Sequence, residues 1–252
     1  MLKKLIKRSF QVLGYDISRH RKFSDFPRDF KEEEVEIISC VRPYTMTSNE
    51  RLYTLVHAVR YVVKNDIPGD IVECGVWKGG SMMAAIKVLQ GLRHEEKNIY
   101  LYDTFEGMSA PTDSDRKIDG TIAKEAFERS RINENSSEWC RSSLEEVRGS
   151  IYSTGYDRSK VHFVKGKVEE TIPKTMPEKI ALLRLDTDWY ESTKHELVHL
   201  FPRLVPGGVL ILDDYGSWLG AQKAVDEYMA EHNVKILLCR IDNSGRVAVK
   251  LS

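Results

Sequence analysis

The chain of 252 residues is 41% hydrophobic and 30% charged, which is ordinary for a globular domain that can bury a full core. Its formal net charge is zero, and this balance excludes the strong basic bias that a nucleic-acid partner would favour. The four cysteines are far apart and form no C-x-x-C pair, which argues against a disulfide framework or a cysteine-built zinc site and predicts a reducing, cytoplasmic compartment.

The first segment in chain order, residues 1–22, is strongly basic, with seven Lys or Arg against a single acid, Asp16. Apolar residues recur in it at helical spacing, opposite basic side chains: Leu2, Leu5, Ile6, Phe10 and Leu13. The pattern predicts an amphipathic helix, either in peripheral contact with the anionic inner face of a membrane or packed on the domain or on a partner subunit of a homo-oligomer. We therefore separate an N-terminal segment, 1–45, from a domain spanning 46–252.

Strand-like and helix-like segments alternate through this domain, which predicts an α/β fold with a parallel sheet. The expected strands are 70–74, 98–103, 161–165, 180–185 and 208–212, and the expected helices are 51–63, 81–89, 143–152 and 221–231. Two strand-like runs then flank a turn at 242–245 and predict an antiparallel hairpin. The sum is a doubly wound, Rossmann-like, mostly parallel seven-stranded sheet with a C-terminal hairpin, which resembles the class I fold of S-adenosylmethionine (SAM) dependent methyltransferases.

The connection between the second and third expected strands, residues 104–160, is unusually long. Its polar part, about 109–138, predicts a mobile, lid-like insertion, although a solvated loop has the same composition. We expect residues that line an acceptor pocket to lie in this insertion.

A glycine-rich turn follows the first expected strand, in the sequence ECGVWKGGS at 73–81. Gly75 and Gly79 permit a positive φ and close backbone approach, and the next helix presents free N–H groups to a ligand. The spacing differs from the nicotinamide pattern and matches the looser SAM-binding turn. Asp103, at the end of the second strand, can accept both ribose hydroxyls, and the loop from Gly166 through Val168 would face the adenine. The alternatives are a turn without a ligand and loop acids that cap helices.

Acidic residues follow the fourth and fifth expected strands: Asp186 after the fourth, Asp213 and Asp214 after the fifth. In a doubly wound sheet these strands are neighbours, and their carboxyl ends open onto the ligand crevice. Converging carboxylates raise one another's pKa unless a cation neutralises them, and oxygen ligands favour Mg²⁺ or a similar hard ion. The alternative is a helix cap at Asp213 or Asp214 beside an exposed Asp186.

A second metal-site pattern overlaps this region, because residues 195–199, HELVH, fit the H-E-x-x-H pattern of zinc peptidases. A zinc hydrolase acting through His195, Glu196 and His199 would need a third ligand, and no such extension follows the motif. Leu197 and Leu200 mark the buried side of this helix, so we expect both histidines in solvent. We favour the carboxylate site over the zinc site.

Four ordered motifs resemble the macrocin O-methyltransferase family within a match over about 45–250: ECGVWKGGS, YDTFEGM at 102–108, LDTDWYEST at 185–193 and PGGVLILDDYG at 206–216. These enzymes methylate sugar hydroxyls of macrolide and aminocoumarin antibiotics with SAM and a divalent metal. The resemblance implies that Asp186, Asp213 and Asp214 bind Mg²⁺ and that Asp186 or Asp188 is the catalytic base. The cofactor-binding residues that it implies are Glu73, Gly75, Gly79, Ser81, Asp103, Thr104, Gly166, Val168, Thr47 and Ser48.

The expected function is SAM- and Mg²⁺-dependent O-methylation of a glycan or glycosylated metabolite that carries vicinal hydroxyls. The basic N-terminal segment resembles the leaders of bacterial surface-polysaccharide enzymes, which favours polysaccharide biosynthesis over natural product biosynthesis. Three alternatives stay open: a catechol-like phenolic acceptor, the zinc hydrolase, and a non-catalytic binding protein.

Overall fold

The computed structural model describes residues 26–251 and divides the chain into two compact units, residues 1–31 and 32–252. Of the first unit it describes residues 26–31, where the Phe30 amide donates to the Pro27 carbonyl at 3.2 Å. The basic helix expected at 1–22, with its membrane or partner contact, lies outside the described residues. In the described part of the chain, no helix is both long and apolar enough to span a bilayer.

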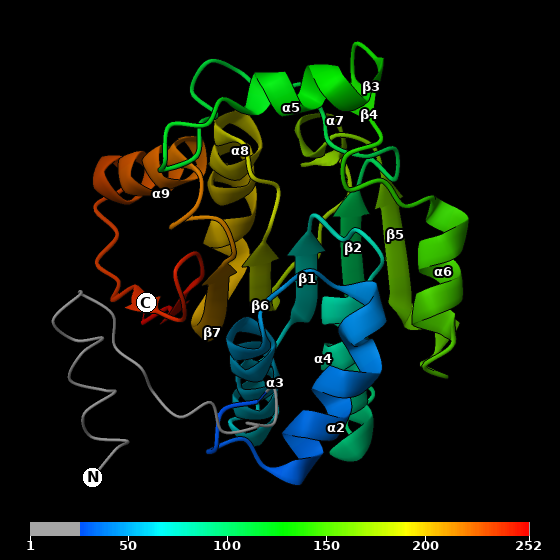
Figure 1. The fold of residues 1–252 in the computed structure, drawn as a ribbon. Coiled ribbons are helices and arrows are strands. Elements are labelled where there is room, and N and C mark those ends of the chain that lie inside the picture. Colours follow the sequence, from blue (N-terminus) through cyan, green and yellow to red (C-terminus); the bar gives the residue numbers. More distant parts are fainter. Residues whose placement is uncertain (1–25, 252) are drawn as a thin grey trace, which may run out of the picture. The chain divides into compact units, whose positions relative to one another are not determined.

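A seven-stranded sheet lies at the centre of the second unit, in the order β5-β2-β1-β6-β7-β9-β8 (Figure 1). The first five of these strands run parallel, and β9 pairs antiparallel with β7 and β8. Their bounds are β1 Asp70–Cys74, β2 Ile99–Asp103, β5 Val161–Lys165, β6 Ile180–Leu185, β7 Leu204–Leu212, β8 Cys239–Arg240 and β9 Arg246–Val249. This arrangement confirms the doubly wound sheet and the terminal hairpin.

The helices form two groups, and within each group neighbours contact one another: α2, α3, α4 and α6 in one, and α7, α8 and α9 in the other. Local sequence fixes their starts, since the Ser48 hydroxyl accepts from the Arg51 amide at 3.1 Å and Ser143 forms a capping box with Glu146. Their bounds are α2 Glu32–Val41, α3 Asn49–Lys64, α4 Gly80–Gly91, α6 Leu144–Tyr152, α7 Val168–Thr171, α8 Tyr190–Leu200 and α9 Leu219–Glu231.

The fifth parallel strand, β7, begins at Leu204 rather than at 208 as expected. Pro206 and Gly207 suggested a break, but the register between β6 and β7 shifts between Ile180 and Leu182 and accommodates them. The first arm of the expected hairpin is shorter than its strand-like sequence suggested. Residues 235–238 are not part of it, and β8 consists of Cys239 and Arg240.

The insertion is structured where its polar composition suggested a loop. It contains α5, Ala123–Ser130, and the ribbon of β3, Arg131–Asn133, with β4, Ser136–Ser137. Asp115 within it is fully buried and accepts from the Tyr190 amide at the start of α8 at 2.8 Å. Lys117 pairs backbone to backbone with Trp218. These contacts fasten the insertion to the domain, and its movement as a lid stays a prediction.

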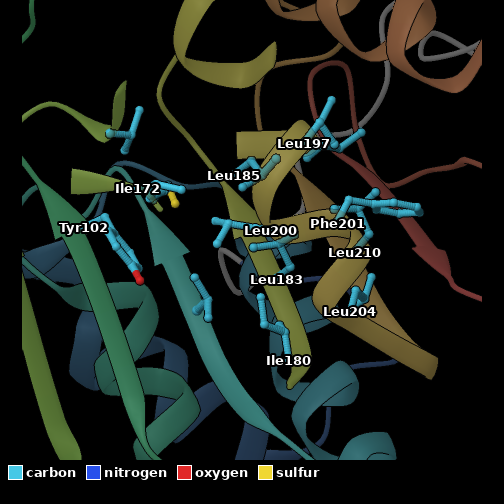
Figure 2. Close-up of a cluster of buried hydrophobic side chains, with 14 of the residues drawn as sticks. Tyr102, Ile172, Ile180, Leu183, Leu185, Leu197, Leu200, Phe201, Leu204 and Leu210 are labelled. Carbon is cyan, nitrogen blue, oxygen red and sulfur yellow. The ribbon is translucent and has the colours of Figure 1, made fainter. Parts of the chain in front are cut away.

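A hydrophobic cluster between the sheet and α8 supports the acidic ends of β6 and β7. Figure 2 shows side chains of β6, β7 and α8 facing one another, among them Leu183, Leu197, Leu200 and Leu210, all of them fully buried. Burial of these side chains stabilises the fold by roughly 1.5–3 kcal/mol each.

We expect Leu183→Ala to lower the free energy of unfolding by about 2–5 kcal/mol, because it leaves a cavity in this cluster. Leu237→Ala is the matched control, since Leu237 is 78% exposed, and it should change stability by about 0.5 kcal/mol or less. Urea denaturation followed by circular dichroism measures both. Equal effects of the two substitutions would contradict the assigned core.

Candidate active site

The glycine turn joins β1 to α4 at the carboxyl edge of the sheet. Gly75 has φ +82°, and a Cβ at this position would lie 1.9 Å from the backbone oxygen of Asp186. Gly79, with φ +89°, is the N-cap of α4, and Trp77 between them also has a positive φ. Gly75 is therefore required for β1 to pass close to the end of β6, and the free N–H groups of α4 open toward this edge.

Asp103, at the end of β2, lies beside this turn as expected. Its carboxylate accepts from the amides of Val76 at 2.7 Å, Trp77 at 3.1 Å and Phe105 at 2.7 Å. Burial raises its pKa, and these hydrogen bonds act in the opposite direction by stabilising the charged form. The acid is thus held at the mouth of the turn.

A first cavity, of about 70 Å³, opens beside Asp103. It brings together residues that the sequence assigned to cofactor binding, from the ends of β1, β2 and β5 and from α7: Gly75, Asp103, Thr104, Gly166 and Val168. Asp186 also lines it. These five residues of the expected cofactor set therefore lie together at the carboxyl edge of the sheet.

A second cavity, of about 420 Å³, lies over the ends of β6 and β7, within the size range of small-molecule sites. Its lining includes Thr47 and Ser81 together with the acidic residues Asp186, Asp188, Asp213 and Asp214. Asp186 is the residue that lines both cavities. The two cavities therefore adjoin at this residue.

Three acids gather at the junction, as expected from the order of the strands. Asp186 follows β6, and Asp213 and Asp214 follow β7, whose ends pair through Leu185 and Leu212. One carboxylate oxygen from each lies within 4.8 Å of the others, and in the described part of the chain no other group of His, Cys, Asp and Glu has this arrangement. Such an all-oxygen set suits a hard divalent cation.

Burial first, and then neighbouring carboxylates, raise the pKa values of Asp186 and Asp214. The pKa of Asp186 lies well above its usual range despite the opposing effect of Arg184, and that of Asp214 is raised in the same way. Burial and Asp186 raise the pKa of Asp188 to about 8. Asp188 has φ +66°, and its amide donates to Asp214 at 3.1 Å.

Arg184, within β6, was missed by the sequence analysis and is 2% exposed. Its guanidinium contacts Asp186 at 2.8 Å, also pairs with Asp213, and donates to Glu73 at 2.7 Å. A charged residue in the otherwise apolar run IALLRL was the available signal, because a buried arginine requires acidic partners.

The structure places some expected cofactor residues outside both cavities. Glu73 is 1% exposed and held by Arg184, and burial raises its pKa to about 7. Ser48 caps α3 and donates to Asp242 at 2.6 Å, and Gly79 lies within the turn. A direct cofactor contact of these three residues stays a prediction.

The HELVH motif forms no site of three or more ligands in the described residues. Glu196 is fully buried and accepts a hydrogen bond from the Thr187 hydroxyl at 3.0 Å. It therefore helps to fix the loop that follows β6. The expectation of two solvated histidines is wrong, since both are half-buried and His195 contacts the Ile172 carbonyl at 2.9 Å. The face of α8 that carries the two histidines packs against neighbouring segments, such as the one at Ile172. The i, i+4 spacing shows that the histidines share a face but not what this face contacts.

Aromatic side chains form one wall of the second cavity, which the sequence analysis also missed. Trp139 and Trp218 line the cavity, with ring centroids 6.1 Å apart, and Trp189 packs behind them. Lys117 of the insertion lies 5.6 Å from the Trp218 ring and lines the same wall. The wall thus combines segments far apart in the sequence.

The strand order and the glycine turn facing the crevice are those of class I SAM-dependent methyltransferases. CalS11, described as a calicheamicin methyltransferase, has this fold at 19% identity, with a TM-score of 0.59 over 93% of this chain and 99% of that one. The family model described as macrocin-O-methyltransferase (TylF) matches residues 3–249. The chain belongs to this family and is a SAM-dependent O-methyltransferase.

Characterised relatives agree with this assignment. The chain is 31% identical to the mycinamicin III 3''-O-methyltransferase of Micromonospora griseorubida, over 80% of this chain and 76% of that protein. It is 32% identical to the demethyldecarbamoylnovobiocin O-methyltransferase of Streptomyces niveus, over 80% and 74%. The solved structure of the O-methyltransferase NovP superposes with a TM-score of 0.72 at 31% identity, covering 83% of each chain.

Gly75→Ala should lower the affinity for SAM at least tenfold. The added Cβ would meet the Asp186 backbone, and the positive φ at this position disfavours alanine. Gly149→Ala in α6 is the control, since no atom outside the helix lies within 4 Å of its Cβ. Isothermal titration calorimetry with SAM measures both. Unchanged SAM affinity in the Gly75 variant would contradict the expectation that this turn binds SAM.

Proposed function

We propose that this enzyme transfers the methyl group of SAM to a hydroxyl of a sugar carried by a glycosylated small molecule or glycan, with a divalent cation such as Mg²⁺ as cofactor. The observation that carries the proposal is the position of Asp186, which lines both cavities. A carboxylate at this junction can act on the acceptor oxygen where it meets the methyl donor. A relative at 32% identity is named as methylating a dimethoxy-rhamnosyl tetracenomycin, which supports a sugar acceptor.

The residues that line the first cavity would bind the adenosine of SAM. Asp103 would accept the ribose hydroxyls through lone pairs that remain beside its amide contacts, and Gly166 and Val168 would border the base. The methionine end would pass over the turn at Gly75 toward Thr47 and Ser81 in the second cavity. This path would bring the sulfonium methyl near Asp186.

Asp186, Asp213 and Asp214 would hold the cation, because they offer an all-oxygen donor set of the required closeness. Two arginines already neutralise part of this charge, through Asp186 and Asp213, whereas Asp214 forms no ion pair among the described residues. When bound, the cation would lower the pKa of an acceptor hydroxyl and favour its reaction near neutral pH.

Asp188 or Asp186 would take the acceptor proton. Burial of Asp188 raises its pKa to about 8, which makes its carboxylate a stronger base than an exposed aspartate. The transfer then balances: the S–CH₃ bond breaks, the O–CH₃ bond forms, and the hydroxyl proton passes to the carboxylate. The neutral product S-adenosylhomocysteine leaves the acidic site without its former positive charge.

Trp139 and Trp218 would seat the acceptor. Sugar rings have an apolar face, and ligand sites commonly combine aromatic surface with a few polar groups that fix orientation. The two rings stand in the same cavity as Asp186 and Asp188. The wall thus supports an acceptor with hydroxyls directed at the acids.

Asp186→Asn should abolish methyl transfer, a fall of about 10²–10⁴ in kcat, because the variant loses both a metal ligand and a candidate base. SAM binding should persist within about threefold, since Asp103 and the glycine turn are unchanged. Asp66→Asn is the isosteric control, as Asp66 is exposed before β1, at the opposite edge of the sheet. A radiometric transfer assay on acceptor panels of glycosides and catechols, with calorimetry for SAM, checks both; full activity of the Asp186 variant would overturn the assignment.

Removal of divalent cations with EDTA should stop methyl transfer, because the positive charge that favours deprotonation of the acceptor hydroxyl is then missing. Added Mg²⁺ should restore the transfer. The same transfer assay measures the loss and the recovery. Transfer at the full rate in EDTA would show that the three acids serve the reaction without an ion.

A further inference from the structure

Arg51, in the first turn of α3, has its guanidinium between two acids from different parts of the chain. Its Nη1 pairs with Asp213 after β7, and its Nε contacts Asp242 of the terminal hairpin at 3.0 Å. The side chain is 17% exposed, in contrast with the 2% of Arg184. Arg51 therefore stands at the solvent side of the acid cluster, and it lines the second cavity.

Asp213 has both carboxylate oxygens committed to arginines. Arg184 contacts Oδ1 and Arg51 contacts Oδ2. Arg184 cannot leave, because Glu73, Asp186 and Thr47 hold the same guanidinium in the interior. Arg51 can keep its contact with a second acid, Asp242, when it leaves Asp213. Asp242 accepts hydrogen bonds from the Ser48 hydroxyl at 2.6 Å and from the Gly245 amide at 2.7 Å, so its position does not depend on Arg51.

The space around the Arg51 stem is provided by Gly245, where a Cβ would lie 2.8 Å from Arg51 Cδ. The stem thus packs directly against the hairpin turn, beside Asp242. Because the guanidinium is planar, a rotation about the Cδ–Nε bond would move it as a whole and release Asp213 Oδ2, while Nε stays beside Asp242. Charge neutralisation favours either cation at this oxygen, but two cations there would repel each other.

We propose that Arg51 is a resident counter-ion that competes with the divalent cation for Asp213, and so sets the metal affinity of the site. The inference rests on the proposed metal site of Asp186, Asp213 and Asp214. Arg51 acts through Asp213 and is a positioning residue rather than a catalytic one. In the absence of metal, Arg51 stabilises the acid cluster. When the metal ion binds, it has to displace Arg51 from Asp213, so its binding is weaker and more readily reversed.

The test is Mn²⁺ binding to the full chain without SAM, measured by electron paramagnetic resonance of the free ion. Arg51→Gln should bind Mn²⁺ about tenfold more tightly than the unmodified enzyme, because the competing cation is gone. Arg129→Gln removes the same charge from the exposed face of α5 and should leave the affinity unchanged. A purely structural role of Arg51 predicts the opposite sign, since a damaged site binds metal less tightly.

Asp242→Asn sharpens the test, because it removes the second acid, which would still pair with Arg51 when a metal ion displaces the arginine from Asp213. It should weaken Mn²⁺ binding in the unmodified background and have no effect in the Arg51→Gln background, which a double-mutant cycle detects. Equal or weaker Mn²⁺ binding by a folded Arg51→Gln protein, as judged by its melting curve, would overturn the inference. Absence of Mn²⁺ binding in every protein, including the unmodified one, would instead overturn the proposed metal site.

Discussion

The site depends on one buried ion network, the guanidinium of Arg184 among Glu73, Asp186 and Asp213. Removing charges from water is costly, and an unpaired buried acid would take up a proton or destabilise the fold. Arg184 meets this constraint from within the central strand β6, so the acids are held in place by the sheet itself. Loss of one partner would leave the others buried without compensation, which makes the network cooperative.

The order of the strands explains why these residues meet. β6 lies between β1 and β7, so the acid of β1, the arginine of β6 and the acids after β6 and β7 occupy three adjacent strands. Parallel strands present all their carboxyl ends at one edge, where the ligand crevice opens. The close pass of Gly75 against Asp186 then connects the glycine turn to the acid cluster without an intervening side chain. The turn and the acid cluster thereby lie at one edge of the sheet.

The sequence was sufficient to predict the sheet, the glycine turn and the grouping of Asp186, Asp213 and Asp214, because each follows from local pattern and parallel topology. It did not identify Arg184 as the centre of the network, since two of its three acidic partners, Glu73 and Asp213, lie 111 and 29 residues away. The half-buried histidines of α8 and the wall of Trp139 and Trp218 depend on how distant segments pack, which spacing along the chain does not encode. The folded insertion was missed for the same reason, as Asp115 finds its partner Tyr190 only in the tertiary structure.

The terminal hairpin has a part in the site as well as in the sheet. Its turn carries Asp242, which holds Arg51, and Ser244, whose hydroxyl donates to the backbone oxygen of Asp213. Because β9 runs antiparallel to β7, its first residue, Arg246, pairs with Leu212, and the turn lies directly beside the acidic end of β7. A parallel last strand would begin at the opposite edge of the sheet. The same hairpin turn therefore orients Asp213 through its backbone and tethers the arginine that neutralises its side chain.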